Sequence, residues 1–269
     1  MTTITSPDNI QIKNAAALKQ KKFRDKTNLF LIEGIRLIET ALACNAQINE
    51  CFYLPTILDN ERGAALINNL AQTKCFMHEV TPAVFNKLAD TDTPQGIVAC
   101  VYKNNVELTN LSLKENSTFI VLDQLQDPGN TGTIIRTADA AGIDAIISLK
   151  GTVDIYSPKV TRATMGALFH LPIVDKITPA DLEDFITKNN ITLLATVLSN
   201  TAAACFDVDY TKTATAIAVG NEGAGVSEQI KLAAAKHIYI PMYGKSESLN
   251  ASCAAAMIMY EIMRQKHTN

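Results

Sequence analysis

Three polar segments, each following an apolar strand-like run, carry most of the residues that could perform chemistry. Residues 130–136 read Asn-Thr-Gly-Thr-Ile-Ile-Arg, residues 220–225 read Gly-Asn-Glu-Gly-Ala-Gly, and residues 248–252 read Ser-Leu-Asn-Ala-Ser. Ligands of open α/β sheets bind in the crevice outside the carboxyl ends of the strands, where such loops gather. The arrangement therefore favours one composite site that takes a small-molecule cofactor.

Arg136 is the most specific candidate for a role in binding or catalysis. It lies among small and apolar residues, where a guanidinium needs a partner such as a carboxylate or a phosphate. Helical side chains lean toward the helix N-terminus, so Arg136 can approach Asn130 only if Asn130 precedes the helix. A structural ion pair is the alternative for Arg136. Glu222 is either a partner for an arginine or a solvated turn residue.

Several common catalytic motifs are missing. The turn from Gly220 to Gly225 has the order G-x-x-G-x-G, which is not the dinucleotide fingerprint, and a plain tight connection is the alternative to a ligand-binding turn. Gly244-Lys245-Ser246 resembles the end of a P-loop, but Tyr239 stands where that motif needs its first glycine. There is no G-x-S-x-G elbow, and the 4 histidines are far apart in the sequence.

Composition fits a globular protein with a sizeable core, because 47% of its 269 residues are hydrophobic and 19% are charged. No apolar run reaches the roughly 20 residues of a membrane span, and residues 1–8 do not resemble a secretory signal. The 6 cysteines include no C-x-x-C pair, which argues against a zinc site and against a disulfide framework. We expect no metal, and buried thiols in a reducing cytoplasm.

The net charge of −3 counts mildly against nucleic-acid binding, but the charge is unevenly distributed. A basic segment near the N-terminus contains Lys13, Lys19, Lys21, Lys22, Arg24 and Lys26, with Asp25 among them. A local patch of this kind can attract phosphates even on an acidic chain. A solvated helix face is the alternative.

The polar, Asn-rich stretch 103–116 predicts a linker. We therefore divide the chain into a domain at 1–105, a linker at 106–116 and a domain at 117–269. Alternating apolar patterns predict a small α/β domain first and a larger α/β domain after it. The predicted strands lie at 29–32, 51–54, 75–78, 96–102, 119–123, 145–149, 171–174, 191–198, 215–219 and 237–241. The predicted helices lie at 35–43, 62–71, 82–89, 130–141, from 157, at 179–188 with Thr178 as cap, at 226–235 and at 249–265.

The three polar segments resemble, in order and spacing, the motifs of the SpoU branch of the SPOUT methyltransferases, also called the TrmH family. The first motif corresponds to residues 127–142, the second to 218–226, and the third to Ile240-Pro241-Met242 with 246–252. The N-terminal part, with Arg24 ahead of residues 29–34, resembles the family's substrate-binding domain of the ribosomal-protein L30e type.

This resemblance implies S-adenosylmethionine-dependent 2′-O-methylation of RNA ribose by a cytoplasmic homodimer. It also implies an α/β-knot, in which a parallel sheet flanked by helices contains a deep trefoil knot. The residues implied to hold the cofactor are Gly220, Ile240, Leu249, Met242 and Leu198. The residues implied to line the catalytic side are Asn130, Arg136, Glu222, Ser248 and Asn250. We expect the methionines of the last helix (Met257, Met259 and Met263) to pack in the core or against a partner subunit.

Several alternatives stay open within this resemblance. In the family's scheme Arg136 acts on the 2′-hydroxyl as a base, but an arginine is essentially always protonated, so an anchor for a phosphate and a developing oxyanion is the other reading. Glu222 either favours the sulfonium donor or holds Arg136. We expect 23S ribosomal RNA as substrate; a tRNA 2′-O-methyltransferase and a non-catalytic RNA-binding scaffold in ribosome assembly are the alternatives.

Overall fold

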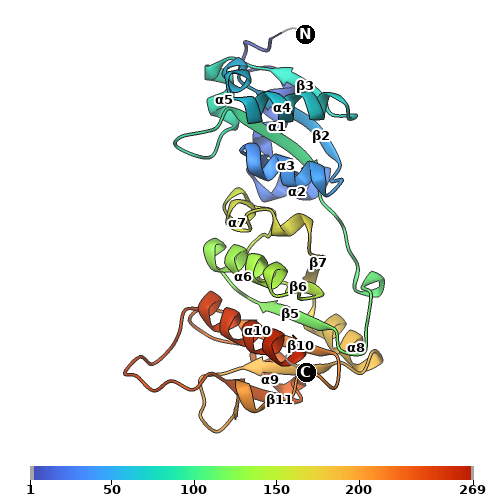
Figure 1. Ribbon diagram of the computed structural model, residues 1–269, viewed down its shortest axis with the longest axis vertical. Coiled ribbons are helices and arrows are strands. Elements are labelled where there is room, and N and C mark those ends of the chain that lie inside the picture. Colours follow the sequence, from blue (N-terminus) through green and yellow to red (C-terminus); the bar gives the residue numbers. More distant parts are fainter. Residues whose placement is uncertain (1–2, 268–269) are drawn as a thin grey trace. The chain divides into compact units, whose positions relative to one another are not determined.

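The protein, described here by a computed structural model of residues 3–267, divides into two units by its contacts (Figure 1). Unit 1 contains the described residues up to Asn104 together with Tyr156–Phe169. Unit 2 contains Asn105–Ile155 and the described residues from His170 onward. The sequence-based division places Tyr156–Phe169 in the C-terminal domain, whereas these residues pack within unit 1.

Unit 1 is built on a four-stranded mixed sheet in the order β1-β4-β2-β3. These strands are β1 (Leu29–Glu33), β4 (Ile97–Tyr102), β2 (Ile48–Tyr53) and β3 (Phe76–Glu79). Strand β4 is antiparallel to both neighbours, and β2 and β3 are parallel. The helices are α1 (Ile10–Ala17), α2 (Lys21–Thr27), α3 (Ile35–Ala43), α4 (Glu61–Ala71), α5 (Pro82–Leu88) and α7 (Pro158–Ala163). Apolar side chains of α1, α5 and the sheet form one core cluster.

The segment around α7 is held against β1 by aromatic packing. The Phe30 ring lies 5.0 Å from the ring of Tyr156 and 6.2 Å from that of Phe169, between centroids. Arg162 forms a 2.6 Å ion pair with Asp90. Burial of Phe30 and Tyr156, with the half-buried Phe169 beside them, explains why this excursion of the chain packs with unit 1.

Unit 2 is built on a seven-stranded sheet in the order β7-β6-β5-β10-β8-β11-β9, and every neighbouring pair is parallel. The strands are β5 (Thr118–Asp123), β6 (Ala145–Leu149), β7 (Ile173–Ile177), β8 (Thr192–Thr196), β9 (Ala203–Ala204), β10 (Thr215–Gly220) and β11 (Lys236–Tyr239). Strands β5, β6 and β10 are buried along their whole length, which explains their continuous apolar sequences.

Helices of unit 2 pack on this sheet in two pairs. They are α6 (Pro128–Ala140), α8 (Pro179–Lys188), α9 (Glu228–Ala233) and α10 (Ala251–His267). Apolar residues of α8 and α9 form one core cluster with the strands, in which the Phe119 and Phe185 rings meet edge to face at 6.0 Å. Outside this cluster, α6 and α10 pack against each other and against β6 and β10 (Figure 1).

The helix ends follow from local capping. Thr178 and Asp181 form a reciprocal capping box at the start of α8, so the predicted helix and its cap are confirmed. The Asp127 carboxylate accepts from the backbone N–H of Asn130 at 2.7 Å, so α6 begins two residues earlier than predicted. The Asn250 side chain accepts from the backbone N–H of Ser252, so Leu249 lies before α10 rather than in it.

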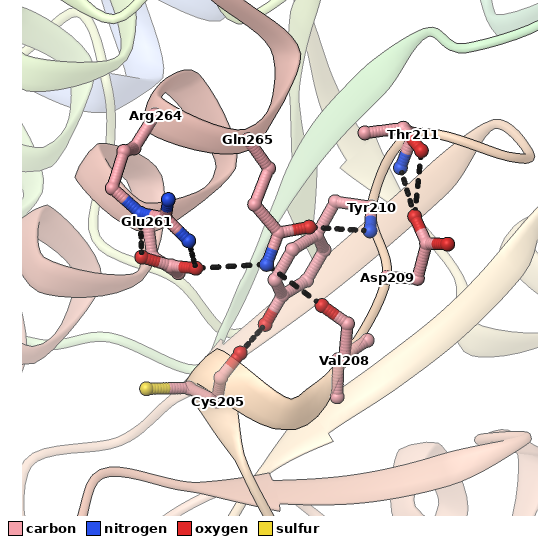
Figure 2. A network of polar contacts seen from close by, with 8 residues as sticks. All are labelled: Cys205, Val208, Asp209, Tyr210, Thr211, Glu261, Arg264 and Gln265. Carbon is pink, nitrogen blue, oxygen red and sulfur yellow. Dashed lines mark hydrogen bonds and ion pairs between the residues drawn. The ribbon is translucent and has the colours of Figure 1, made fainter. Parts of the chain in front are cut away.

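The C-terminal part of α10 is tied to the loop between β9 and β10 (Figure 2). Gln265 accepts from the backbone N–H of Tyr210 at 3.1 Å and donates to the carbonyl of Val208 at 2.9 Å and to Glu261 at 2.8 Å. The Tyr210 ring is fully buried, and its hydroxyl donates to the carbonyl of Cys205 at 2.7 Å. Burial raises the pKa of Tyr210, so it remains a hydrogen-bond donor.

Two further properties concern residues 3–267. No helix there is long and apolar enough to cross a bilayer. Nor do three or more His, Cys, Asp or Glu side chains of that range gather closely enough to hold a metal ion.

Candidate cofactor and catalytic site

A pocket in unit 2 lies where β8, β10 and β11 end. Its volume is about 300 Å³. The walls come from the residues that follow β8, from the loop after β10, from the segment after β11 and from the first turns of α10. Because the three strands are parallel and adjacent, their carboxyl ends open to one edge of the sheet, where α/β proteins bind ligands.

The structure places all five residues expected to hold the cofactor around this pocket. They are Leu198, Gly220, Ile240, Met242 and Leu249. Two of the expected catalytic residues, Glu222 and Ser248, also line it. Aliphatic side chains and the glycine-rich loop therefore line one open pocket.

The loop after β10 has its shape because residue 220 is glycine. A Cβ atom there would lie 2.1 Å from the backbone carbon of Gly225, which no side chain can tolerate. Asn221 and Gly225 pair through two backbone hydrogen bonds, and the Asn221 side chain accepts from the N–H groups of Gly223 and Ala224 at 2.9 Å each. The loop is thus a closed turn whose form does not depend on a ligand.

Glu222 is bound at the start of α6. Its carboxylate accepts from the backbone N–H groups of Gln126 and Asp127 and from the Asn130 side chain, each at 3.1 Å. Partial burial raises the pKa of Glu222, but these hydrogen bonds outweigh it, so the pKa is lowered overall. An ionised carboxylate with three donors serves to fix geometry and is a weak proton acceptor.

Asn130 links Glu222 to α10. The Asn250 side-chain nitrogen donates to the side-chain oxygen of Asn130 at 2.9 Å. The Asn250 oxygen accepts from the backbone N–H and the hydroxyl of Ser252, at 2.9 and 2.6 Å. Glu222, Asn130 and Asn250, one from each polar segment, therefore form a continuous chain of hydrogen bonds.

Arg136 is not brought into contact with this chain. It lies on the exposed side of α6 and, within residues 3–267, its side chain makes no hydrogen bond or ion pair. The expectation that Glu222 holds Arg136 does not fit a single subunit, because the Glu222 carboxylate is bonded to the start of α6 instead. The guanidinium is free to meet an anion from outside the subunit.

The basic segment of unit 1 is only partly available for binding. Within residues 3–267, Lys21, Lys22 and Lys26 are exposed, and their side chains make no hydrogen bond or ion pair. Lys13 pairs with Asp8 at 2.9 Å, and Lys19 donates to the backbone carbonyl that follows α5 at 2.5 Å. Arg24 is 3% exposed and donates to the carbonyl of Leu18 at 2.6 Å. Its burial does not fit direct contact with RNA. A basic sequence pattern alone does not show which of its side chains are buried.

Two structural residues of the site escaped sequence reasoning. Asp127 caps α6, and Asn221 donates from its side chain to the carbonyl of Gln124 at 3.0 Å, which joins the loops after β10 and β5. An Asp immediately before Pro128 is a recognisable helix-start signal. The bridging role of Asn221 has no such signal, because it depends on β5 and β10 being neighbours.

Comparison with known proteins agrees with this geometry. Residues 117–260 match the model of the SpoU rRNA Methylase family, and residues 9–99 match that of the MRM3-like substrate binding domain. The chain is 34% identical to the Bacillus subtilis (strain 168) 23S rRNA (guanosine(2553)-2'-O)-methyltransferase RlmP, over 97% of this chain and 99% of that protein.

Two solved structures are similar over nearly the whole chain. The AdoMet-bound rRNA methyltransferase from Sinorhizobium meliloti has 32% identity and a TM-score of 0.85, with 98% of this chain and 97% of that one covered. The SpoU methyltransferase AviRb from Streptomyces viridochromogenes, in complex with AdoMet, has 28% identity and a TM-score of 0.88, with 96% and 98% covered. The resemblance inferred from the three motifs is therefore confirmed, and the chain belongs to the SpoU rRNA methylase family.

Proposed function

We propose that this chain transfers a methyl group from S-adenosylmethionine (AdoMet) to the 2′-hydroxyl of a ribose in 23S ribosomal RNA. The observation that carries the proposal is the pocket at the ends of β8, β10 and β11, whose lining includes Glu222, and the hydrogen bonds that join Glu222 through Asn130 to Asn250. A relative covered along almost its whole length is named as a 23S rRNA 2'-O-methyltransferase.

The residues around the pocket fit AdoMet. A volume of about 300 Å³ lies at the lower end of the range of small-molecule sites. Leu198, Ile240 and Leu249 offer apolar surface for a purine, and the loop from Gly220 offers backbone groups for polar ends. When bound there, AdoMet supplies an electrophilic methyl group on a sulfonium.

The chain's own residues orient the ribose and its phosphate. Arg136 binds a phosphate of the substrate and stabilises the negative charge that develops on the 2′-oxygen, since a guanidinium does not act as a base at neutral pH. Ser248 and Asn250 orient the ribose by hydrogen bonds. Glu222 holds Asn130, and through it Asn250, so its contribution is positioning.

We assign RNA substrate binding to the N-terminal domain at 1–105, with 106–116 as linker and 117–269 as the methyltransferase domain. The match of residues 9–99 to a substrate binding domain supports this role. The proposed phosphate contacts are the three exposed lysines of α2, which are Lys21, Lys22 and Lys26.

The functional unit is proposed to be a homodimer that acts in the cytoplasm on ribosomal RNA. Helix α10 supports a dimer, because Cys253, Met257 and Tyr260 are exposed at the spacing of one helix face. Met257 is 48% and Tyr260 63% exposed, whereas Met259 is fully buried in the subunit. A second copy would cover this apolar stripe.

The proposed methyltransferase domain includes a trefoil knot. Its support is that the late strand β10 lies between β5 and β8, while the last element, α10, returns to pack beside the early helix α6.

A paired substitution tests the dimer. Met257→Glu with Tyr260→Glu places two carboxylates on the stripe and should convert the dimer to a monomer in sedimentation or light scattering. Leu232→Glu, at a residue of α9 that is 85% exposed, is the control and should leave the mass unchanged. A wild-type monomer at micromolar concentration rejects the proposal.

The activity is tested with Arg136→Ala, AdoMet and deproteinised 23S rRNA. Methyl transfer should fall by about a hundredfold or more, as when an oxyanion donor is removed, while AdoMet affinity by calorimetry stays within a few-fold. Full activity of the variant would show that Arg136 has no role in the reaction. If the wild type does not bind AdoMet, the proposed enzymatic activity is wrong and a scaffold is favoured. If only tRNA is methylated, the proposed substrate is wrong.

A further inference from the structure

A second hollow of unit 2 adjoins the cofactor pocket at the β9–β11 edge of the sheet. The two share Val197, Leu198 and Lys231 in their walls. We call the second hollow the edge groove; the residues that give it its character are Ser199, Thr201, Lys231, Lys236 and His237. The groove and the pocket are thus separated by one shared wall of three residues.

The edge groove is basic and rich in hydroxyls. Among the described residues that line it, none is a carboxylate. Lys236 and His237 are exposed on β11. Within residues 3–267 the Lys236 side chain makes no hydrogen bond or ion pair, and the His237 ring lies 3.0 Å from the backbone carbonyl of Lys231. Lys231 pairs with Glu228, which lies outside the groove, at 2.8 Å. The hydroxyls of Ser199 and Thr201 are 2.7 Å apart.

The opposite edge of the same sheet has the opposite charge. A hollow beside β7 is lined by Glu107, Asp175, Asp181 and Asp184, with Lys188 as its basic residue. The two edges therefore differ in what they would attract, and a polyanion is favoured only at the edge that adjoins the cofactor pocket.

We propose that the edge groove binds the sugar-phosphate backbone of the substrate RNA next to the nucleotide that receives the methyl group. The inference rests on the proposed function and adds to it a contact surface on the catalytic unit. Ammonium groups and hydroxyls together bind phosphate oxygens without regard to sequence, which is the chemistry of backbone positioning. Because the groove and the pocket share Val197, Leu198 and Lys231, the groove is the adjoining surface on which the phosphates next to the methylated nucleotide would lie.

The test uses Lys236→Gln in the full chain, with deproteinised 23S rRNA as the probe. The dissociation constant should rise roughly fivefold at low salt, and the slope of log affinity against log salt should fall by about 1, as for the loss of one phosphate contact. AdoMet affinity by calorimetry and the mass in solution should not change. The KM for RNA should rise with the dissociation constant.

Lys188→Gln is the matched control, because it removes the same charge from the acidic hollow at the other edge. It should leave RNA affinity and salt slope at the wild-type values. Equal effects of the two substitutions would show a general loss of charge and overturn the proposal. Weakened AdoMet binding in Lys236→Gln would assign the groove to the cofactor, and a changed mass would assign it to a subunit interface; either result overturns it.

The measurements distinguish an error in the proposed role of the edge groove from an error in the proposed function. Methyl transfer by the wild type, with Lys236→Gln unchanged in RNA affinity, rejects the groove alone. Reduced RNA affinity in Lys236→Gln, with no methyl transfer by the wild type, rejects the function and retains the groove as an RNA-binding surface.

Discussion

The side-chain nitrogen of Asn250 donates a 2.9 Å hydrogen bond to the side-chain oxygen of Asn130, which lies 120 residues earlier in the chain. This bond fixes the orientation of both amides. The Asn250 oxygen is occupied by Ser252 at the start of α10, and the Asn130 nitrogen by Glu222. The first turns of helices α6 and α10 are therefore joined beside Glu222, which lines the cofactor pocket.

A double-mutant cycle measures how strongly this point holds the fold together. Asn130→Ala, Asn250→Ala and the double variant should show a coupling of about 1 kcal/mol in the free energy of unfolding, because the two side chains share one hydrogen bond. Each single variant should cost more than the coupling alone, since Asn250→Ala also removes a helix cap and Asn130→Ala also removes the hydrogen bond to Glu222. Urea unfolding gives all four values.

Asn130→Ala combined with Thr178→Ala is the control for that cycle. Thr178 caps α8 and has no partner in common with Asn130. The two effects should add within about 0.5 kcal/mol. Additive effects in the Asn130 and Asn250 pair as well would mean that their hydrogen bond contributes nothing to stability.

Glu222 should make stability depend on pH in the acid range. Its pKa is lowered in the folded chain, so its contribution is present above the ordinary value of 4.5 and is lost as pH falls through the lower folded value. Glu222→Gln has no such titration. The difference in unfolding free energy between the wild type and this variant should therefore shrink as pH falls below about 4.5; a difference independent of pH contradicts the assignment.

The two glycines at 220 and 223 should respond differently to the same substitution. Gly220→Ala places a Cβ 2.1 Å from the Gly225 backbone, so the loop must open and AdoMet affinity should fall by roughly a hundredfold or more. At Gly223 the nearest atom to a Cβ is 3.6 Å away, an ordinary contact. Gly223→Ala should keep affinity within a few-fold by calorimetry. Similar affinities for both variants would show that the loop adapts.

The alternation of strands and helices could be predicted from sequence, because each element has its own apolar pattern. Strand order could not, because the placement of β10 between β5 and β8 depends on pairing between distant segments. Helices α1 and α2 were missed. At 8 and 7 residues they are short, and such helices depend on tertiary packing more than on propensity.

The sequence predicts which residues belong to the candidate site more readily than it predicts the contacts among them. The three motifs identified Glu222, Asn130 and Asn250, which the fold brings into hydrogen-bonding distance. Nothing in their spacing shows that Glu222 bonds to Asn130 rather than to Arg136. That choice follows from where α6 begins, and the cap at Asp127 sets this point.

The contact between Gln265 and the loop around Tyr210 should hold α10 independently of its N-terminal end (Figure 2). Gln265→Ala leaves the backbone N–H of Tyr210 and the carbonyl of Val208 without their partner, which should cost about 2–3 kcal/mol of unfolding free energy. Tyr210→Phe loses only the bond to Cys205 and should cost about 1 kcal/mol. Denaturant unfolding measures both.

Asp209→Asn is the control, because Asp209 lies in the same loop, keeps an acceptor for Thr211 after substitution and loses only an exposed ion pair with Lys212, which contributes little to stability. Its unfolding midpoint should stay near that of the wild type. AdoMet affinity should change little in Gln265→Ala, since the Asn130–Asn250 bond still fixes the end of α10 that lines the pocket. If Gln265→Ala lost as much AdoMet affinity as Gly220→Ala, the whole of α10 would shift when its C-terminal contact is lost. Its two ends would then not be held independently.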